Sequence, residues 1–220
     1  NGLAHMSKDS KVNILPENYT AFADYVFDVA QHFRSEGIPV TAVSPINEPQ
    51  WDWTGGQEGC HYEPAEVSAV LKAFVARLRE RGLEDEMEIT APESGEWGGR
   101  TREYVNAILG DEILGKYFSA MDIHSYWSNL DSKVNFKKWL DEHYPDTGLV
   151  MSEWCEMVNG SDVTMDSAYH IAQEIANDLR ILDVVSWQNW VGVAPGGYRD
   201  GLIYIDEASQ KFRALKRLYS

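Results

Sequence analysis

The chain has 220 residues, 44% of them hydrophobic, and its 35 acidic side chains outnumber 19 basic ones, giving a formal net charge of -16. This length is that of one large domain or two small ones, and the acidic balance argues against nucleic acid or an anionic membrane as a partner. The absence of an apolar run approaching roughly 18 residues argues against insertion into a membrane.

The predicted elements alternate between helix and strand along the chain. Segment 16–38 is an amphipathic helix with Gly37 as its stop, and its apolar residues at spacings of three and four are Tyr19, Phe22, Tyr25, Val26, Val29 and Phe33. A buried strand over 40–46 and a helix over 64–83 follow; the helix has an apolar face of Val67, Val70, Leu71, Phe74, Val75 and Leu78. We then expect strands with following loops over 87–97, 118–127, 148–157 and 183–192, helices over 101–109, 136–143 and 168–182, a short strand over 202–206 and a last helix from near Ser209.

Alternation of this kind predicts an α/β fold with a parallel sheet. Two architectures fit, a doubly wound open sheet or a (β/α)8 barrel. The glycines of segment 54–59 lack the GxGxxG spacing and the preceding strand of a phosphate loop. A barrel places polar functional residues at the carboxyl ends of several strands, and this pattern occurs at Asn47, Glu48, Glu93, His124, Tyr126, Glu153, Trp187 and Gln188. Because five strands are predicted, we expect residues 1–220 to be a partial barrel whose first strands are missing.

Two glutamates stand out because each directly follows a hydrophobic strand. Glu48 ends the run VTAVSPIN, Glu153 ends GLVMS, and tryptophans flank both. Strand ends converge on one bowl in a barrel, so the two carboxylates can face each other across a sugar. Cleavage of a glycosidic bond requires such a pair: one carboxyl protonates the leaving oxygen, and the other attacks or activates water. For a single glutamate at a strand end, an ion pair or a helix cap is the common alternative.

Other residues are expected to serve the same bowl. Asn47 is a candidate for binding the sugar hydroxyl next to the reacting carbon, His124 and Tyr126 for orienting a carboxylate, and Glu93 for a polar wall. The sequence has 8 Trp, 11 Tyr and 7 Phe, and flat apolar rings suit the faces of sugars. Candidates for sugar stacking or positioning are therefore Trp51, Trp53, Trp187 and Gln188, with loop packing an equal alternative for the first two.

The sequence predicts neither a metal nor a cofactor. Glu58, His61 and Glu63 have an irregular spacing, and no second cluster supports a metal site. Cys60 and Cys155 are too few for a disulfide scaffold, and their pairing stays open.

Five ordered segments resemble glycoside hydrolase family 30, of the large clan of retaining (β/α)8 enzymes. They are SPINEPQWDW, GQEGCHY, MSEWC, SWQNWV and YRDGLIYID. The resemblance implies that Glu48, after the fourth strand, is the acid/base, and that Glu153, after the seventh, is the nucleophile. It also implies that the predicted strands are strands four to eight, and that the absent strands and a β-sandwich domain complete the protein.

The branch that NEPQWDW and QEGCHY resemble most is that of the endo-β-1,6-galactanases. The expected partner is a β-linked oligo- or polysaccharide, and the expected location is secreted, periplasmic or at the cell surface. Relatives in other branches act on β-1,4-xylan, β-1,6-glucan or glucosylceramide. A non-catalytic carbohydrate-binding protein and a metal-dependent barrel hydrolase remain as alternatives, and residues 1–220 alone are expected to be weakly active or inactive.

Overall fold

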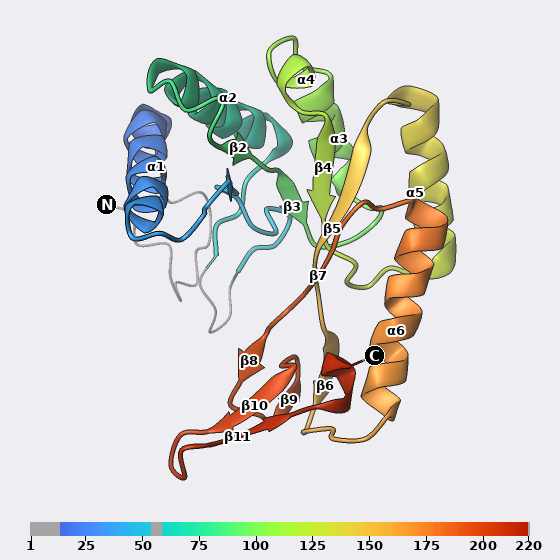
Figure 1. Ribbon diagram of the computed structural model, residues 1–220. Helices are drawn as coiled ribbons and strands as arrows, with labels where there is room; N and C mark the ends of the chain where they lie inside the picture. Colours follow the sequence, from blue (N-terminus) through green and yellow to red (C-terminus); the bar gives the residue numbers. More distant parts are fainter. Residues whose placement is uncertain (1–13, 54–58, 220) are drawn as a thin grey trace.

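The computed structural model describes residues 14–53 and 59–219. Parallel strands alternate with helices along this part of the chain (Figure 1). The barrel-type strands are β1 (Ala42–Val43), β2 (Glu88–Ile89), β3 (Pro92–Ser94), β4 (Ala120–Ile123), β5 (Gly148–Trp154) and β7 (Trp187–Asn189). β1 pairs with β2, and β3, β4, β5 and β7 pair in that order, every pair being parallel. Since only two residues separate β2 from β3, the described wall consists of five successive strands in chain order.

The helices flank this wall, with α1 and α2 on one side and α5 and α6 on the other (Figure 1). Their bounds are η1 (Pro16–Asn18), α1 (Tyr19–Ser35), α2 (Pro64–Glu80), α3 (Thr101–Leu109), α4 (Leu114–Tyr117), α5 (Leu130–His143), α6 (Asp166–Asn177) and the π-helical turn η2 (Asp178–Leu182). Local sequence explains where α2 begins and where α1 ends. Glu63 and Glu66 form a capping box before α2, and Gly37, with φ of +84°, follows the end of α1.

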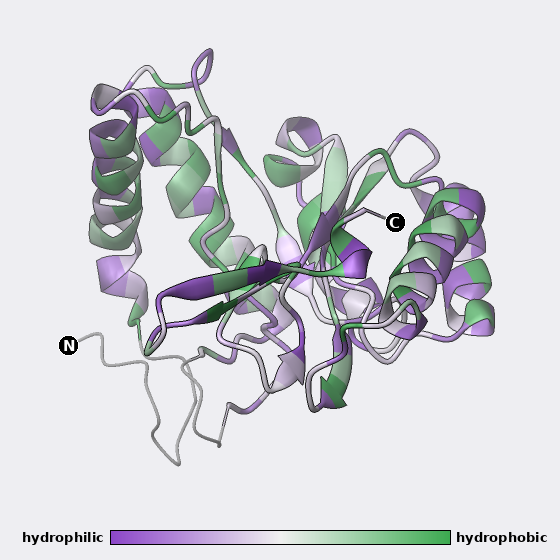
Figure 2. Cartoon of the chain, turned by 60° about the horizontal axis from the view of Figure 1, so that its bottom comes forward, coloured by the Kyte–Doolittle hydropathy of each residue, from purple (hydrophilic) through white to green (hydrophobic). Residues whose placement is uncertain are grey.

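The core lies between the helices and the strands. All six apolar residues predicted for the face of α2 are buried, and the helices in Figure 2 carry both hydrophobic and hydrophilic bands. The predicted face of α1 is partly wrong, because Tyr25, Val29 and Phe33 are exposed and the buried stripe includes Ala23 and Phe27. Apolar residues occur on two adjacent sides of this helix, so their spacing alone does not select the inner side.

The ring of Phe27 lies 5.6 Å from that of Phe74 on α2, and the small side chain of Ala23 is fully buried beside it in the core. This packing explains which side of α1 faces inward.

The C-terminal part forms two small sheets beside the carboxyl ends of the barrel strands (Figure 1). β6 (Glu156–Asn159) pairs with β9 (Tyr198–Arg199), and β10 (Ile203–Asp206) lies between β8 (Val193–Ala194) and β11 (Lys211–Ala214). The short strand predicted over 202–206 is therefore present.

The last predicted helix is wrong. From Ser209 the chain instead forms β11, antiparallel to β10, and then one 3-10 turn, η3 (Lys216–Leu218). The physical reason is a tight turn in which Asp206 accepts hydrogen bonds from the backbone N–H groups of Ala208 and Ser209.

Two expectations about the chain as a whole can be compared with the described residues. None of their helices combines the length and the apolar character needed to cross a bilayer. No disulfide joins Cys60 to Cys155, both of which are described.

Candidate active site

Glu48 occupies a tightly fixed turn after β1. Its φ of +42° is in the left-handed region, which few residues other than glycine adopt. Its backbone N–H donates to the carbonyl of Glu93 at 2.8 Å, and its own carbonyl accepts from the indole Nε1 of Trp53 at 3.2 Å. These contacts hold the residue from both sides and leave it 8% exposed.

Glycine at position 95 allows the approach of the Glu48 turn to the next strand. A Cβ atom at Gly95 would lie 2.9 Å from Oε1 of Glu48 and 2.5 Å from the side-chain amide of Gln50. With its amide oriented to satisfy both donors, Gln50 accepts hydrogen bonds from the backbone N–H of Gly95 at 2.7 Å and from Trp51 Nε1 at 3.2 Å. The sequence around Glu48 therefore specifies one geometry.

Glu153 lies near the end of β5 and faces the same space. The Tyr126 hydroxyl donates to its Oε1 at 3.1 Å. Burial raises the pKa of Glu153, whereas the charge of His124 and the hydrogen bond from Tyr126 lower it, and the charges of Glu48 and Glu93 raise it again. Burial also raises the pKa of Tyr126, as do Cys155 and Glu153, so its hydroxyl stays protonated as a donor.

The two predicted catalytic carboxyls come close together around His124. One ligand atom from each of Glu48, His124 and Glu153 lies within 4.8 Å of the others. The imidazole Nδ1 is 3.1 Å from Oε1 of Glu48 and 3.9 Å from Oε1 of Glu153. Both glutamates are thus placed to act on one bound molecule.

Glu93, expected to form a wall of the bowl, lies on the other side of His124. Its Oε2 is 3.3 Å from the imidazole Nε2 and also accepts a hydrogen bond from the hydroxyl of Ser152. Its backbone, with φ of +54°, is again left-handed. Because Ser152 directly precedes Glu153, Glu93 links the strand ends that carry Glu48, His124 and Glu153.

The histidine is buried among three carboxylates, and its protonation follows from that position. Burial alone lowers the pKa of His124. Hydrogen bonds to Glu48 and Glu93 and the charge of Glu153 act against burial and raise this pKa to about 9. The imidazole is therefore a cation at neutral pH, which offsets part of the negative charge of the cluster.

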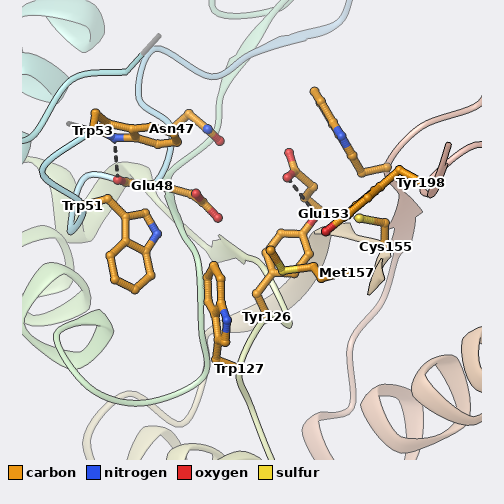
Figure 3. Close-up of a pocket in the computed structure, with 11 residues that line it drawn as sticks. Asn47, Glu48, Trp51, Trp53, Tyr126, Trp127, Glu153, Cys155, Met157 and Tyr198 are labelled. Atoms are coloured by element: carbon orange, nitrogen blue, oxygen red, sulfur yellow. Dashed lines mark hydrogen bonds between the residues drawn. The ribbon is translucent and has the colours of Figure 1, made fainter. Parts of the chain in front are cut away.

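A cleft of about 890 Å³ opens above this cluster (Figure 3). Glu48 and Glu153 enter it from opposite sides, and most of the other side chains are aromatic. The lining residues are Asn47, Glu48, Trp51, Trp53, Tyr126, Trp127, Glu153, Cys155, Met157, Trp190 and Tyr198. Six sequence-predicted residues are in this set, and aromatic faces beside carboxylates suit a sugar with both apolar faces and hydroxyls.

Two predicted residues occupy other places. Trp187, expected as a sugar platform, does not line the cleft; its Nε1 donates to Oδ2 of buried Asp178 at 3.0 Å. Gln188 lines a smaller hollow of about 320 Å³ together with Glu93 and His124. The side chain that reaches the cleft from this segment is Trp190, three residues beyond Trp187.

Sequence reasoning missed five lining residues: Trp127, Cys155, Met157, Trp190 and Tyr198. Trp127 and Trp190 had a usable signal, since each follows a predicted strand end within a few residues. The others depend on the small β6–β9 sheet, which the strand pattern did not predict.

The atoms of Glu48, His124 and Glu153 are close enough to hold a metal ion. Binding one would require His124 to lose a proton that it holds up to a pKa of about 9, so the donor set is a poor fit to a metal at neutral pH. In the other candidate cluster, His61 contacts Glu63 at 3.1 Å and Glu63 pairs with Arg100. Glu58 and the segment 54–58 lie outside the described residues.

Comparisons of the sequence with known proteins identify a family. The model of O-glycosyl hydrolase family 30 matches residues 1–124 and 116–204. An endo-β-1,6-galactanase of Hypocrea rufa is 36% identical over 78 residues, which are 34% of this chain and 16% of that protein.

Solved structures resemble almost the whole chain. A conserved exported protein from Bacteroides fragilis has a TM-score of 0.76 at 21% identity, over 97% of this chain and 51% of that one. The endo-β1,6-glucanase BT3312 has a TM-score of 0.72 at 20% identity, over 97% of this chain and 49% of that one. The chain therefore spans about half the length of these structures, and the predicted (β/α)8-type fold is confirmed.

Proposed function

The chain belongs to O-glycosyl hydrolase family 30, and on this premise we propose that it is part of the catalytic domain of a retaining glycosidase. The observation that supports this most directly is that one carboxylate oxygen of Glu48 lies within 4.8 Å of one carboxylate oxygen of Glu153. Retaining enzymes hold their two carboxyl groups about 5–5.5 Å apart, whereas inverting enzymes leave about 6.5–9.5 Å for a water molecule. The short separation favours double displacement.

In the proposed reaction, Glu153 is the nucleophile and Glu48 the acid/base. Glu48 gives its proton to the glycosidic oxygen while a carboxylate oxygen of Glu153 bonds to the anomeric carbon, and the bond to the leaving sugar breaks. Glu48 then takes a proton from water, whose oxygen displaces Glu153 and restores both groups. We propose that Asn47, which lines the cleft beside Glu48, binds the hydroxyl next to the anomeric carbon.

The reaction requires Glu153 to be ionised when the substrate binds, although burial raises its pKa. The hydroxyl of Tyr126 and the imidazolium of His124 both lower the pKa of Glu153, which favours the ionised form that the reaction needs. Glu48, the proposed proton donor, has its Oε1 3.1 Å from Nδ1 of His124. We assign Tyr126 and His124 the role of keeping the nucleophile charged.

The proposed substrate is a β-linked polysaccharide, and the particular polysaccharide that we propose is a β-1,6-galactan. The likeness to a protein described as an endo-β-1,6-galactanase supports this choice. The likeness to an endo-β1,6-glucanase supports a β-1,6-glucan as the alternative substrate. The likeness to an exported protein supports action outside the cytoplasm. Other segments of a longer protein are proposed to supply the remaining barrel strands and a β-sandwich domain.

The test uses the intact protein with β-1,6-galactan, β-1,6-glucan and β-1,4-xylan. We expect reducing ends from the β-1,6-galactan, with proton NMR showing the β-anomer as the first product. A first product of inverted configuration would overturn the double displacement. Binding of a polysaccharide without release of reducing ends would favour a carbohydrate-binding protein, and loss of activity with EDTA would favour a metal-dependent hydrolase.

A further inference from the structure

Two exposed tryptophans form a corner at one side of the cleft. Trp51 is 37% exposed and Trp127 is 58% exposed, although both are large apolar side chains. Their ring centroids are 5.1 Å apart and their planes meet at 77°, so one indole presents its edge to the face of the other. Both rings line the cleft that contains Glu48 and Glu153.

The indole of Trp51 is fixed by the turn that carries Glu48. Its Nε1 donates to the amide oxygen of Gln50 at 3.2 Å, and its backbone N–H donates to the carbonyl of Glu48 at 3.2 Å. Because the polar atom of the ring already has a partner, the part of the ring that faces the cleft is apolar.

Trp127 is held in place at an energetic cost. Its φ of +49° is left-handed, a conformation that is unfavourable for any residue other than glycine. Ser128 donates to the carbonyl of Tyr126 at 2.9 Å and accepts from the backbone N–H of Trp97 at 2.8 Å, which braces this loop. Since an indole exposed to this extent gains little from burial, the strain indicates a function for the exposed ring.

The side of the cleft on which the corner lies identifies its ligand. Figure 3 shows Trp51 on the side of Glu48, with Trp127 next to it, while Met157 and Tyr198 lie across the cleft with Glu153. In double displacement the acid protonates the oxygen of the departing group, so that group lies against the acid. We propose that Trp51 and Trp127 form the subsite for the leaving-group sugar, an inference that rests on the proposed function.

The chemistry of the corner matches an uncharged sugar ring. One indole face can stack against the C–H face of the ring, and the perpendicular indole contacts its edge. Among the described residues that line the cleft none is cationic, so an acidic sugar would gain no ion pair there. The corner should contribute mainly to binding of the substrate, because neither indole touches the proton or the anomeric carbon.

The experiment compares substrates that fill this subsite with substrates that leave it empty. β-1,6-Galacto-oligosaccharides and β-1,6-gluco-oligosaccharides have a leaving sugar, whereas the β-fluorides of the corresponding disaccharides release only fluoride. The intact protein is assayed as wild type, Trp51→Ala, Trp127→Ala and Trp127→Phe. Tyr169→Ala is the matched control, because Tyr169 is a 64% exposed aromatic residue on α6 outside the cleft lining.

Each alanine variant should lose about tenfold or more in kcat/KM on oligosaccharides, mainly through a higher KM. The fluorides should change less than threefold, Trp127→Phe should regain most of the loss, and Tyr169→Ala should match wild type. The subsite alone would be overturned if the wild type is active but the alanine variants keep its kcat/KM on oligosaccharides. The same conclusion would follow if their kcat/KM falls equally on oligosaccharides and fluorides. A wild type inactive on oligosaccharides and fluorides would overturn the proposed function, and the subsite with it.

Discussion

His124 and Glu48 form a buried pair in which the imidazole Nδ1 lies 3.1 Å from Oε1 of the glutamate. The opposite nitrogen is 3.3 Å from Glu93, so the ring cannot rotate without losing a charged partner. This arrangement fixes the proposed acid/base through a cation that is itself fixed. It also explains how several carboxylates coexist in a nearly closed space, since the imidazolium offsets their mutual repulsion.

The two glutamates should fail in different ways when changed to glutamine in the intact protein. Glu48→Gln should lower kcat on polysaccharide by about 10²–10⁴-fold, because the leaving oxygen loses its proton donor. It should spare the first step with a glycosyl fluoride, since fluoride leaves without a proton. Glu153→Gln should abolish both reactions, because no nucleophile remains.

Initial rates and the burst of fluoride release measure this difference. Glu112→Gln is the matched control, because Glu112 is an exposed acid whose carboxyl lies 3.4 Å from the amine of Lys116. Normal rates in both active-site variants would refute the assignment of the two carboxyls.

Tyr126→Phe should shift the acidic limb of the kcat/KM profile to higher pH. The hydroxyl of Tyr126 donates to Glu153 and lowers its pKa, against the effect of burial. Without it the pKa of Glu153 rises further, and a higher pH is needed to ionise the nucleophile. The measurement is kcat/KM from about pH 4 to 8; an unmoved or downward-shifted limb would contradict the role given to Tyr126.

Asp122→Asn should stabilise the protein above neutral pH. Burial raises the pKa of Asp122 to about 7, and the charges of Glu93 and Glu88 act in the same direction. An unfolded aspartate has a pKa of about 3.9, so the folded state retains a proton that the unfolded state has lost, and stability falls as pH rises from about 4 to 7. Asparagine removes that loss.

Urea unfolding of the intact protein measures the effect. We expect a gain in unfolding free energy of up to about 4 kcal/mol at pH 8 and a clearly smaller gain at pH 5. A change of equal size at both pH values would show that ionisation of Asp122 is not its cause.

Trp187→Phe should reduce stability and leave KM unchanged. Its Nε1 is one of the donors to Asp178, a fully buried carboxylate that also accepts from Ser125 and Lys133. Removing a donor from a buried acceptor costs about 1–3 kcal/mol. Trp190→Phe is the natural comparison, because Trp190 lines the cleft and its change should raise KM with less effect on stability. The reverse pattern would restore Trp187 as a sugar platform.

The sequence predicted the positions of the two glutamates because parallel strands end at one edge of a barrel. It named Trp187 at the last strand end, whereas Trp190 is the tryptophan of this segment that lines the cleft, because side chains alternate along a strand. Trp187 and Trp190 are three positions apart, so in a continuous strand their side chains would point to opposite faces. The sequence alone does not show where the strand ends and this alternation stops.

The error after Ser209 has a different origin. Phe212, Leu215 and Leu218 are spaced as on a helix, yet only Leu215 is buried. Pairing of β11 with β10 in a tight hairpin overrode that local preference, and the turn at Asp206 that joins the two strands was not predicted.

The left-handed backbone at Glu48 and Glu93 positions these side chains for the active site but lowers the stability of the fold. Glycine or asparagine at either position would relax the backbone and remove a crowded negative charge, so such replacements should make the protein harder to unfold. At Glu48 the replacement would also remove the proposed acid/base, and at Glu93 it would remove a partner of His124. Selection for heat resistance alone would therefore erode these two glutamates. A search for tougher variants has to hold both positions constant and look for its gains elsewhere in the molecule.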